Sequence, residues 1–154
     1  MCCRNPWERL FLIYVNRAVS SDYKKEIHAV CKWKDLDLDK PGLTFERFLR
    51  CIASGTDDKQ WKPQWMLCNV CSTAFSFIGH METGENDATS VLSTLGFNKN
   101  FSHMFASEMH RSMEAFYLDI PPDLLKKLVE KYQFDFELYG YDKQPPGRDD
   151  VMVE

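Results

Sequence analysis

The sequence predicts an α/β domain in which helices dominate, and three observations lead to this class. A short apolar stretch stands directly before a strongly capped helix, an aromatic alternation marks a strand near residues 75–79, and several segments have the apolar spacing of amphipathic helices. Strands are few for an α/β domain, so we expect part of the sheet to be missing from this chain.

Composition limits the class of protein. The 154 residues are 44% hydrophobic and 14% aromatic, which suits a single domain with a real core. The net charge of −4 argues against a nucleic-acid binder, although lysines gather at residues 24–34 and leave room for a small anionic ligand. The longest apolar run near the N-terminus, residues 10–15, is too short to span a bilayer and lacks the layout of a signal peptide.

The first predicted helix covers residues 6–18. Asn5 is a good N-cap, Pro6 suits the first helical position, and Glu8 has the capping-box spacing from Asn5. Its apolar face should contain Trp7, Leu10, Ile13, Tyr14 and Ala18. Leu12 falls on the opposite, polar face, which is unusual for an exposed helix.

Residues 1–3 could be the end of a strand, and Arg4 follows them directly. A strand, an arginine and a helix N-terminus together form a plausible anion-binding site, because free backbone N–H groups and the helix dipole favour negative charge. An ordinary capped helix with a surface arginine is the alternative interpretation.

The next segments are a second amphipathic helix at residues 21–33 and an acidic loop. Asp35, Asp37, Asp39 and Glu46 occupy the first, third, fifth and twelfth positions of a calcium-binding loop. Lys40 stands where that loop requires glycine, so the pattern favours a solvated acidic loop.

Thr44 should cap a helix that ends before Gly55, with Phe45, Phe48, Leu49 and Ile52 facing a core. A polar loop anchored by tryptophans follows. The strand through Phe75 and Phe77 should end at Gly79.

Thr83 should cap the next helix, with Gly96 as its stop. We expect its inward side chains to be Ala88, Val91, Leu92 and Leu95. A short helix at residues 109–117 and a proline-started helix that continues into an aromatic segment complete the domain, residues 1–142. Residues 143–154 should form a disordered tail.

The six cysteines do not predict a metal site. Cys68 and Cys71 have the spacing of half a zinc site, but no second closely spaced pair completes it. A disulfide, or buried thiols, is the favoured interpretation.

Five segments, in this order, resemble the Golgi carbohydrate sulfotransferases that sulfate chondroitin, dermatan and related glycans. They are RNPWERLFLIY, TFERFLRCI, QWKPQWMLCNVC, FSFIGHMETGENDATSVLSTLG and YQFDFELYGY, and the resemblance runs from about residue 4 to residue 141. Within that family the segments look like those of the chondroitin/dermatan 4-O-sulfotransferases. The resemblance implies a P-loop-like α/β fold, a Golgi membrane glycoprotein and a glycan acceptor, possibly chondroitin or dermatan.

The resemblance also implies the sulfuryl donor, 3′-phosphoadenosine 5′-phosphosulfate (PAPS). The first segment looks like the part of the family that binds the donor's 3′-phosphate, with Arg4 as a charged hydrogen-bond donor. The cofactor-binding residues would be Arg4, Asn5, Trp7, Glu8, Arg9 and Leu12. The chain departs from the family at Leu12, where members usually have a serine that holds the same phosphate, and leucine cannot donate a hydrogen bond.

Smaller departures occur at Asn5, Gln60 and His80, where family members tend to have aspartate or histidine, histidine, and lysine. Glu82 matches the family's "ET" position and is the leading candidate for the base that takes the acceptor's proton, with His80 and Asp87 as other candidates. A capping or core-polar role explains Glu82 equally well.

The family's other donor motif, a loop whose lysine grips the 5′-phosphosulfate, lies upstream of the 3′-phosphate segment. We therefore expect the chain to correspond to the C-terminal part of a sulfotransferase domain, with impaired catalysis. The alternative is a non-catalytic remnant that binds a nucleotide, a glycan or a partner. A luminal setting would imply that Cys68 and Cys71 are oxidised or within bridging reach of Cys31 or Cys51.

Overall fold

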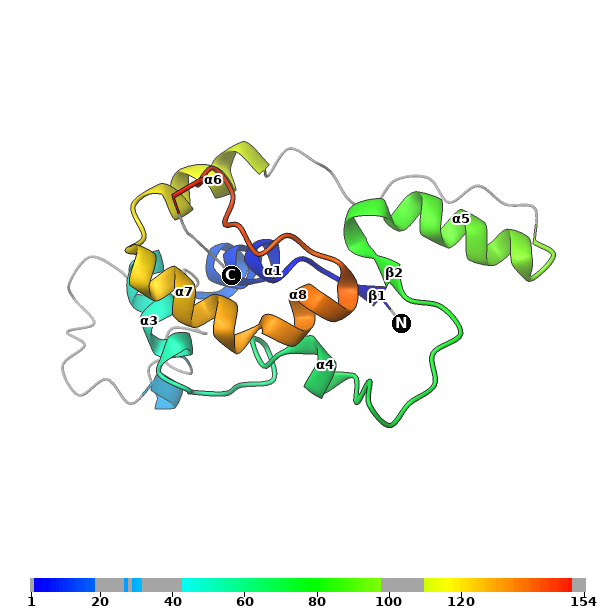
Figure 1. Ribbon diagram of the computed structural model, residues 1–154, viewed down its shortest axis with the longest axis horizontal. Helices are drawn as coiled ribbons and strands as arrows, with labels where there is room; N and C mark the ends of the chain where they lie inside the picture. The colour runs from blue at the N-terminus through cyan, green and yellow to red at the C-terminus, as the bar shows by residue number, and fades with distance from the viewer. Residues whose placement is uncertain (1, 19–26, 28, 32–42, 98–109, 151–154) are drawn as a thin grey trace.

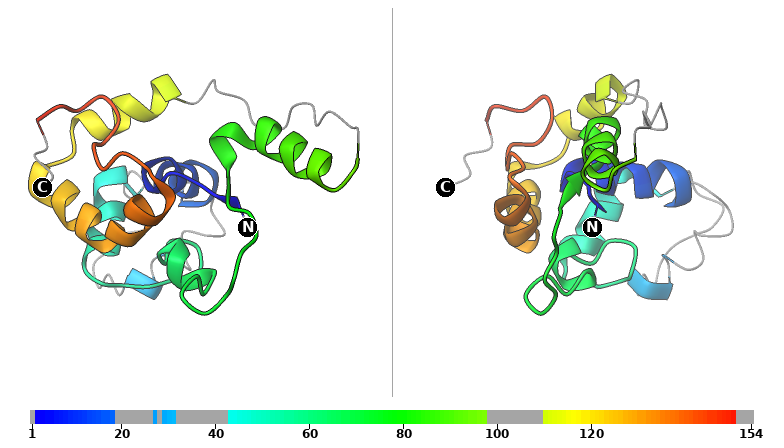
Figure 2. Two further views of the ribbon diagram at one scale, coloured as in Figure 1. Left: turned by 45° about the vertical axis from the view of Figure 1, so that its right-hand side comes forward. Right: turned by 90° about the vertical axis from the view of Figure 1, so that its right-hand side faces the viewer.

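Figure 1 shows a computed structural model of the chain, in which residues 2–18, 27, 29–31, 43–97 and 110–150 are described. Helix α1 (Pro6–Ile13) lies in the middle of a body formed with α3 (Phe45–Ala53), α6 (His110–Leu118), α7 (Pro122–Lys131) and α8 (Gln133–Tyr139), as Figures 1 and 2 show. The short α4 (Gln64–Leu67) contacts α8, and α3 packs against α7.

The predicted start of α1 is confirmed. The Asn5 side chain accepts a hydrogen bond from the backbone N–H of Trp7 at 2.9 Å, and Pro6 is the first helical residue. The helix is α-helical to Ile13 and continues as a π-helical segment, η1 (Tyr14–Ala18), so the whole predicted range is helical. The Tyr14 hydroxyl donates to the carbonyl of Leu43 at 2.7 Å and holds this segment against the start of α3.

The core forms around α1. The Trp7 ring lies 5.4 Å from the rings of both Tyr117 and Phe136, measured between centroids. The same buried cluster contains Leu10 of α1 and the residues Leu124, Leu125 and Leu128 of α7. Leu12 is also buried, at 9% exposed, because α1 is covered on most of its circumference. Its placement on an exposed polar face is therefore wrong.

The described residues contain one sheet, of two short parallel strands. β1 (Cys2–Cys3) pairs with β2 (Gly79–His80), with Cys2 opposite Gly79 and Cys3 opposite His80. The strand predicted at the N-terminus is confirmed, but the strand predicted through Phe75 and Phe77 is wrong. The Phe77 side chain is 39% exposed, and in the described residues the pairing begins only at Gly79, the predicted end of the strand, and continues to His80.

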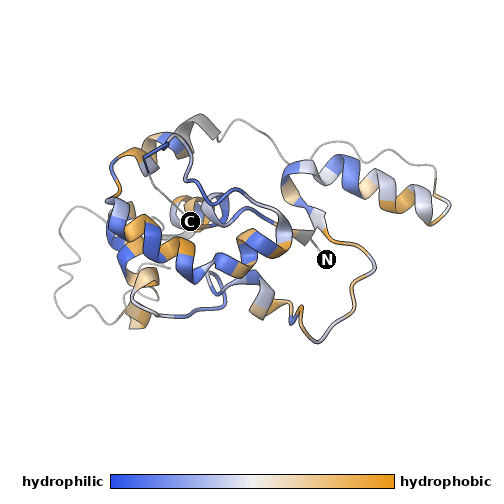
Figure 3. Ribbon diagram, in the orientation of Figure 1, coloured by the Kyte–Doolittle hydropathy of each residue, from blue (hydrophilic) through white to orange (hydrophobic). Residues whose placement is uncertain are grey.

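The 3₁₀ segment η2 (Met81–Thr83) leads into α5 (Gly84–Thr94), which extends away from the body in Figures 1 and 2. Of the predicted inward side chains, Ala88, Val91 and Leu92 are half-buried and none is fully buried, while Leu95 just beyond the helix is 66% exposed, so the predicted inward face is only partly covered and its Leu95 is wrong. Figure 3 shows apolar residues along this helix and along the segment before β2. Thr83 stands at the N-cap position, but its hydroxyl donates to the Asp87 carboxylate at 2.8 Å instead of accepting from a backbone N–H.

Helix α3 is capped as predicted, since the Thr44 hydroxyl accepts from the backbone N–H of Arg47 at 3.3 Å. Gly55 follows its end with φ +89°, a conformation that favours glycine. The calcium-loop pattern lies mostly outside the described residues, as does most of the helix predicted at residues 21–33, of which 27 and 29–31 are described and helical.

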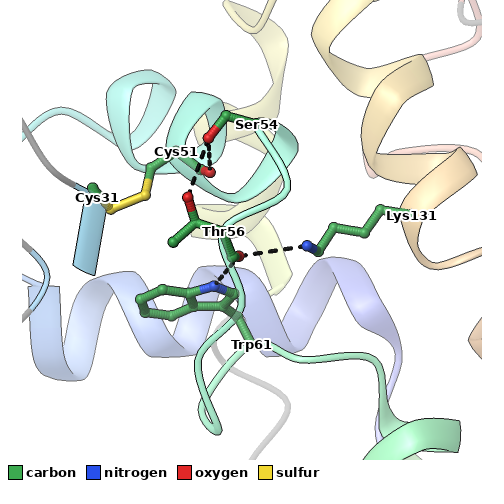
Figure 4. The surroundings of a disulfide bond; sticks show 6 residues. All are labelled: Cys31, Cys51, Ser54, Thr56, Trp61 and Lys131. Atoms are coloured by element: carbon green, nitrogen blue, oxygen red, sulfur yellow. Dashed lines mark hydrogen bonds between the residues drawn. A yellow bond between two sulfur atoms is a disulfide. The ribbon is translucent and has the colours of Figure 1, made fainter.

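A disulfide joins Cys31 to Cys51 of α3 (Figure 4). Cys68 and Cys71 are free thiols, so the expectation that they are oxidised or bridged to this pair is corrected. Beside the disulfide, the carbonyl of Thr56 accepts hydrogen bonds from the Trp61 indole at 2.9 Å and from Lys131 at 3.5 Å, and Trp61 is the buried anchor of its loop.

Residues 143–150, in the predicted tail, are described and pack on α6. The Arg148 guanidinium donates to the carbonyls of Tyr117, Leu118 and Ile120 at 3.2, 2.7 and 2.9 Å. These carbonyls lie at and just beyond the end of α6, where backbone acceptors lack helical partners. Residues 151–154 lie outside the described part.

Candidate functional site

The candidate site lies where β1 ends and α1 begins. The Gln64 side chain clamps the backbone of Arg4 there: its Oε1 accepts from the Arg4 N–H at 3.0 Å, and its Nε2 donates to the Arg4 carbonyl at 2.7 Å. This pair fixes the direction of the chain as it enters α1. The Arg4 guanidinium is thereby presented beside the first turn of the helix.

The Arg4 side chain contributes a charged donor to the site. Its Nε is buried and, among the described residues, has no hydrogen-bond partner; it forms a long ion pair with Glu8 Oε2, at 4.0 Å. A buried donor left unpaired is costly, so such a group in a native fold calls for an explanation. An anionic ligand at the N-terminus of α1 would satisfy it.

Arg9, the second arginine of the segment, is committed to the protein itself. Its guanidinium donates to the carbonyls of Gln60 and Lys62 at 2.7 and 2.9 Å and so holds the loop before α4. Burial lowers the pKa of Arg9, and the nearby Asp135 opposes this shift. Arg9 is therefore an anchor of the loop and does not point to a free anion site.

Asp135 was not predicted from the sequence, yet it organises one side of the site. It is fully buried on α8, and its two carboxylate oxygens accept from the backbone N–H groups of Gln64 and Trp65 at 2.7 and 2.8 Å. Burial raises the pKa of Asp135, while these two hydrogen bonds and the charge of Arg9 lower it. Asp135 thus caps α4 and positions Gln64 against Arg4.

Glu82 reaches the same corner from η2. Its Oε1 accepts from the backbone N–H of Asn5 at 2.7 Å, and its Oε2 accepts from the hydroxyl of Tyr141 at 3.0 Å. Glu82 is an exposed residue. The structure therefore brings Glu82 next to the segment predicted to bind the donor, although the two lie 77 residues apart in the sequence.

His80 and Asp87, the other candidates for the base, hold the junction between β2 and α5. Asp87 Oδ2 accepts from the backbone N–H of His80 at 2.7 Å, and this bond holds the pKa of the Asp87 carboxyl below its ordinary value. His80 Nε2 lies 2.8 Å from the carbonyl of Tyr139. Because a carbonyl only accepts, Nε2 carries a proton and is engaged.

The structure thus separates the predicted residues into two groups. Arg4, Asn5, Glu8 and Glu82 lie together at the corner, whereas Trp7, Arg9 and Leu12 are turned into the protein or its loops. Sequence reasoning missed Gln64, Asp135 and Tyr141. The signal available for Asp135 was an acidic residue between two phenylalanines, Phe134 and Phe136, in the aromatic segment 132–141.

Metal-ligand clusters and long apolar helices are two features absent from the described residues. These residues contain no group of three or more histidine, cysteine, aspartate or glutamate side chains that could hold a metal ion. The same part of the chain contains no helix of the length and apolarity needed to cross a bilayer.

Known proteins match the chain over most of its length. It is 27% identical to carbohydrate sulfotransferase 14 of Danio rerio over 157 residues, covering 92% of the chain and 43% of the relative. It is 26% identical to carbohydrate sulfotransferase 10 of Gallus gallus, covering 90% of the chain and 45% of the relative, and 26% identical to carbohydrate sulfotransferase 10 of Homo sapiens, covering 91% and 46%. The chain thus spans less than half the length of these relatives.

No solved structure matches the chain. Residues 1–142 match the family described as "Sulfotransferase family", a range that includes the corner formed by Arg4, Asn5 and Glu82 and ends just after Tyr141. The match covers nearly the whole chain, and the chain belongs to the sulfotransferase family.

Proposed function

We propose that this chain carries the 3′-phosphate side of the donor site of a carbohydrate sulfotransferase, which moves a sulfuryl group from PAPS to a glycan hydroxyl. The observation that carries the proposal is the buried Nε of Arg4 beside the N-terminus of α1, which has no hydrogen-bond partner among the described residues and meets the Glu8 carboxylate only at 4.0 Å. A phosphate there would pair with the guanidinium and face the positive end of the helix dipole.

The residues present fit this phosphate in part. Arg4 offers a charged donor, whereas the guanidinium of Arg9 is already bonded to loop carbonyls and the buried Leu12 offers no donor. Asn5, Trp7 and Glu8 supply the capped first turn. We therefore expect measurable but weak binding.

Glu82 is the proposed base for the acceptor hydroxyl. Sulfuryl transfer, like phosphoryl transfer, depends mostly on positioning and on stabilisation of charge, and PAPS would supply the group transferred. A general base must remain within reach of the acceptor proton. Two hydrogen bonds, from Asn5 and Tyr141, fix the Glu82 carboxylate at the corner where the donor segment begins.

The relatives are named carbohydrate sulfotransferases, which supports a glycan acceptor. We propose a glycan acceptor of the chondroitin or dermatan type, a P-loop-like α/β fold for the whole enzyme, and a place in the Golgi. Because the chain spans 43–46% of these relatives, each of these statements concerns the whole protein and remains a proposal.

A non-catalytic protein that binds nucleotide or glycan is the second candidate. The commitment of Arg9 to the loop and the burial of Leu12 favour it, since both reduce the donors available to the 3′-phosphate. We expect little or no sulfate transfer from the enzyme candidate and none from the non-catalytic candidate. The two candidates therefore differ in whether any sulfate is transferred.

Calorimetry with 3′-phosphoadenosine 5′-phosphate tests the site. Arg4→Ala should weaken binding by about 1.5–3 kcal/mol, roughly 10- to 150-fold, because a hydrogen bond to a charged group is lost. The matched control is Arg50→Ala, which removes the same charge from an exposed pair with Glu46 and should leave binding unchanged. Equal binding by the unmodified and Arg4→Ala chains would exclude the site.

A labelled-sulfate assay on chondroitin and dermatan separates the two candidates. Transfer by the chain supports the enzyme, and its loss in Glu82→Gln would support the proposed base. Nucleotide binding through Arg4 without transfer supports the non-catalytic protein.

A further inference from the structure

We infer that Tyr141 is a positioning residue that holds the Glu82 carboxylate on the backbone N–H of Asn5. This inference rests on the proposed function, because it concerns the carboxylate proposed there as the base. It assigns a structural role to the segment directly after α8, for which the sequence analysis predicted no role.

The hydrogen-bond geometry points the Tyr141 hydroxyl at Glu82. The hydroxyl lies 3.0 Å from Glu82 Oε2 and 3.5 Å from Cys3 Sγ. It has one proton, and a carboxylate is a much stronger acceptor than a thiol sulfur. Burial, together with the neighbouring Cys3 and Glu82, raises the pKa of Tyr141 well above its ordinary value, so the hydroxyl stays a donor.

Tyr141 is itself held firmly. Gly140 ends α8 with φ +68°, a left-handed conformation, and the backbone N–H of Tyr141 then donates to the carbonyl of Phe136 at 3.0 Å. The Tyr141 ring meets the His80 ring edge-on at 5.3 Å between centroids. His80 also bonds to the carbonyl of Tyr139, so β2 and the end of α8 are joined at two points.

Glu82, in contrast, has little else to fix it. It is exposed, and its hydrogen bonds among the described residues are those to Asn5 and Tyr141. A long carboxylate side chain with a single hydrogen bond regains much of its rotamer freedom. Removal of the Tyr141 hydroxyl should therefore loosen the contact with Asn5, which lies at the N-terminus of α1.

The chain contains a matched control two residues away. The hydroxyl of Tyr139 is buried and has no hydrogen-bond partner among the described residues. Tyr139→Phe and Tyr141→Phe therefore remove the same atom from the same turn, and only the second breaks a bond to Glu82.

The experiment follows the amide cross-peak of Asn5 in ¹⁵N–¹H spectra of the 154-residue chain. Tyr141→Phe should move it in the direction seen for Glu82→Ala, and Tyr139→Phe should leave it in place. The double variant Tyr141→Phe/Glu82→Ala should match Glu82→Ala alone, since the tyrosine acts only through the carboxylate. Additive displacements, or equal displacements by both Tyr→Phe changes, would overturn the inference.

A reciprocal measurement covers the case in which Tyr141→Phe does not fold. Glu82 is exposed, so Glu82→Ala should keep the fold and shift the ¹³Cζ resonance of Tyr141 but not that of Tyr139. No shift at Tyr141 would also overturn the inference. If the chain does not bind the nucleotide, the proposed function is rejected, but the coupling between Tyr141 and Glu82 is unaffected. If the nucleotide binds through Arg4 and the coupling is absent, only the positioning role of Tyr141 is rejected.

Discussion

Arg4 and Arg9 lie five residues apart at the start of one helix, and their surroundings give them different roles. Arg9 is bonded through both terminal nitrogens to loop carbonyls near the buried Asp135, whereas the buried Nε of Arg4 has no hydrogen-bond partner in the described part of the chain. The two residues are of the same type, so the partners that each side chain meets distinguish the loop anchor, Arg9, from the candidate ligand-binding group, Arg4.

Leu12 allows a test at this scale. Leu12→Ser should lower the free energy of unfolding by about 2–4 kcal/mol, because a buried leucine is lost and a hydroxyl is buried in its place. If the serine hydroxyl reaches the 3′-phosphate, nucleotide affinity should rise by about 0.5–1.5 kcal/mol, the net value of one hydrogen bond. Urea unfolding and calorimetry measure the two effects.

The control for this change is Leu12→Ala, which removes the bulk without adding a donor. Equal nucleotide affinities for the serine and alanine variants would show that position 12 does not face the phosphate.

At the scale of elements, α3 is held to the core and to a disulfide, whereas α5 extends away from the body of the protein. Cys31–Cys51 ties the helical residues 29–31 to α3, whose buried face packs on the core. Helix α5 has no buried side chain, and the exposed Leu95 and Phe97 follow it. Apolar periodicity is present in both α3 and α5, so periodicity alone does not decide which helix is covered.

Removal of the disulfide should cost stability. The double variant Cys31→Ser/Cys51→Ser should lose about 3 kcal/mol of unfolding free energy, the value expected from loop-closure entropy for a sequence separation of 20 residues. Cys71→Ser, at an exposed free thiol, is the control and should be close to neutral. Urea denaturation under non-reducing conditions provides the measurement, and unchanged stability in the double variant would contradict the entropic argument.

At the scale of the whole molecule, buried tyrosines join distant segments around α1. The Tyr117 hydroxyl of α6 donates to the carbonyl of Trp7 at 2.8 Å, and the Tyr132 hydroxyl donates to the carbonyl of Trp61. Burial raises the pKa of both tyrosines above the ordinary value. Each must therefore stay protonated for the fold to keep its hydrogen bond.

Stability should consequently fall at alkaline pH. Above about pH 10 the unfolded chain releases the phenolic protons and the folded chain retains them, so the unfolded state binds fewer protons and is favoured as pH rises. Each tyrosine should remove about 1.4 kcal/mol per pH unit until its folded pKa is reached. Urea midpoints at pH 8, 10 and 11 test this, and Tyr132→Phe should show a shallower decline than the unmodified chain. Equal slopes for the two proteins would argue against the role of Tyr132.

The sequence by itself determined the local elements and the family. The cap at Asn5, the cap at Thr44, the turn at Gly55 and the start of α1 are set by neighbouring residues, and all four are confirmed. The predicted family is confirmed as well, since residues 1–142 match the sulfotransferase family. Signals of this kind act within one turn of helix or along a continuous segment, so they can be read without the fold.

Only the tertiary structure decided which side chains are covered and what each polar group meets. Gln64 clamps Arg4 across 60 residues, Glu82 reaches Asn5 across 77, and Tyr141 reaches Glu82 across 59. The burial of Leu12, the exposure of α5 and the two-residue length of β2 depend in the same way on distant neighbours. Burial and hydrogen-bond partners are properties of contacts across the chain, and a pattern read along the sequence does not contain them.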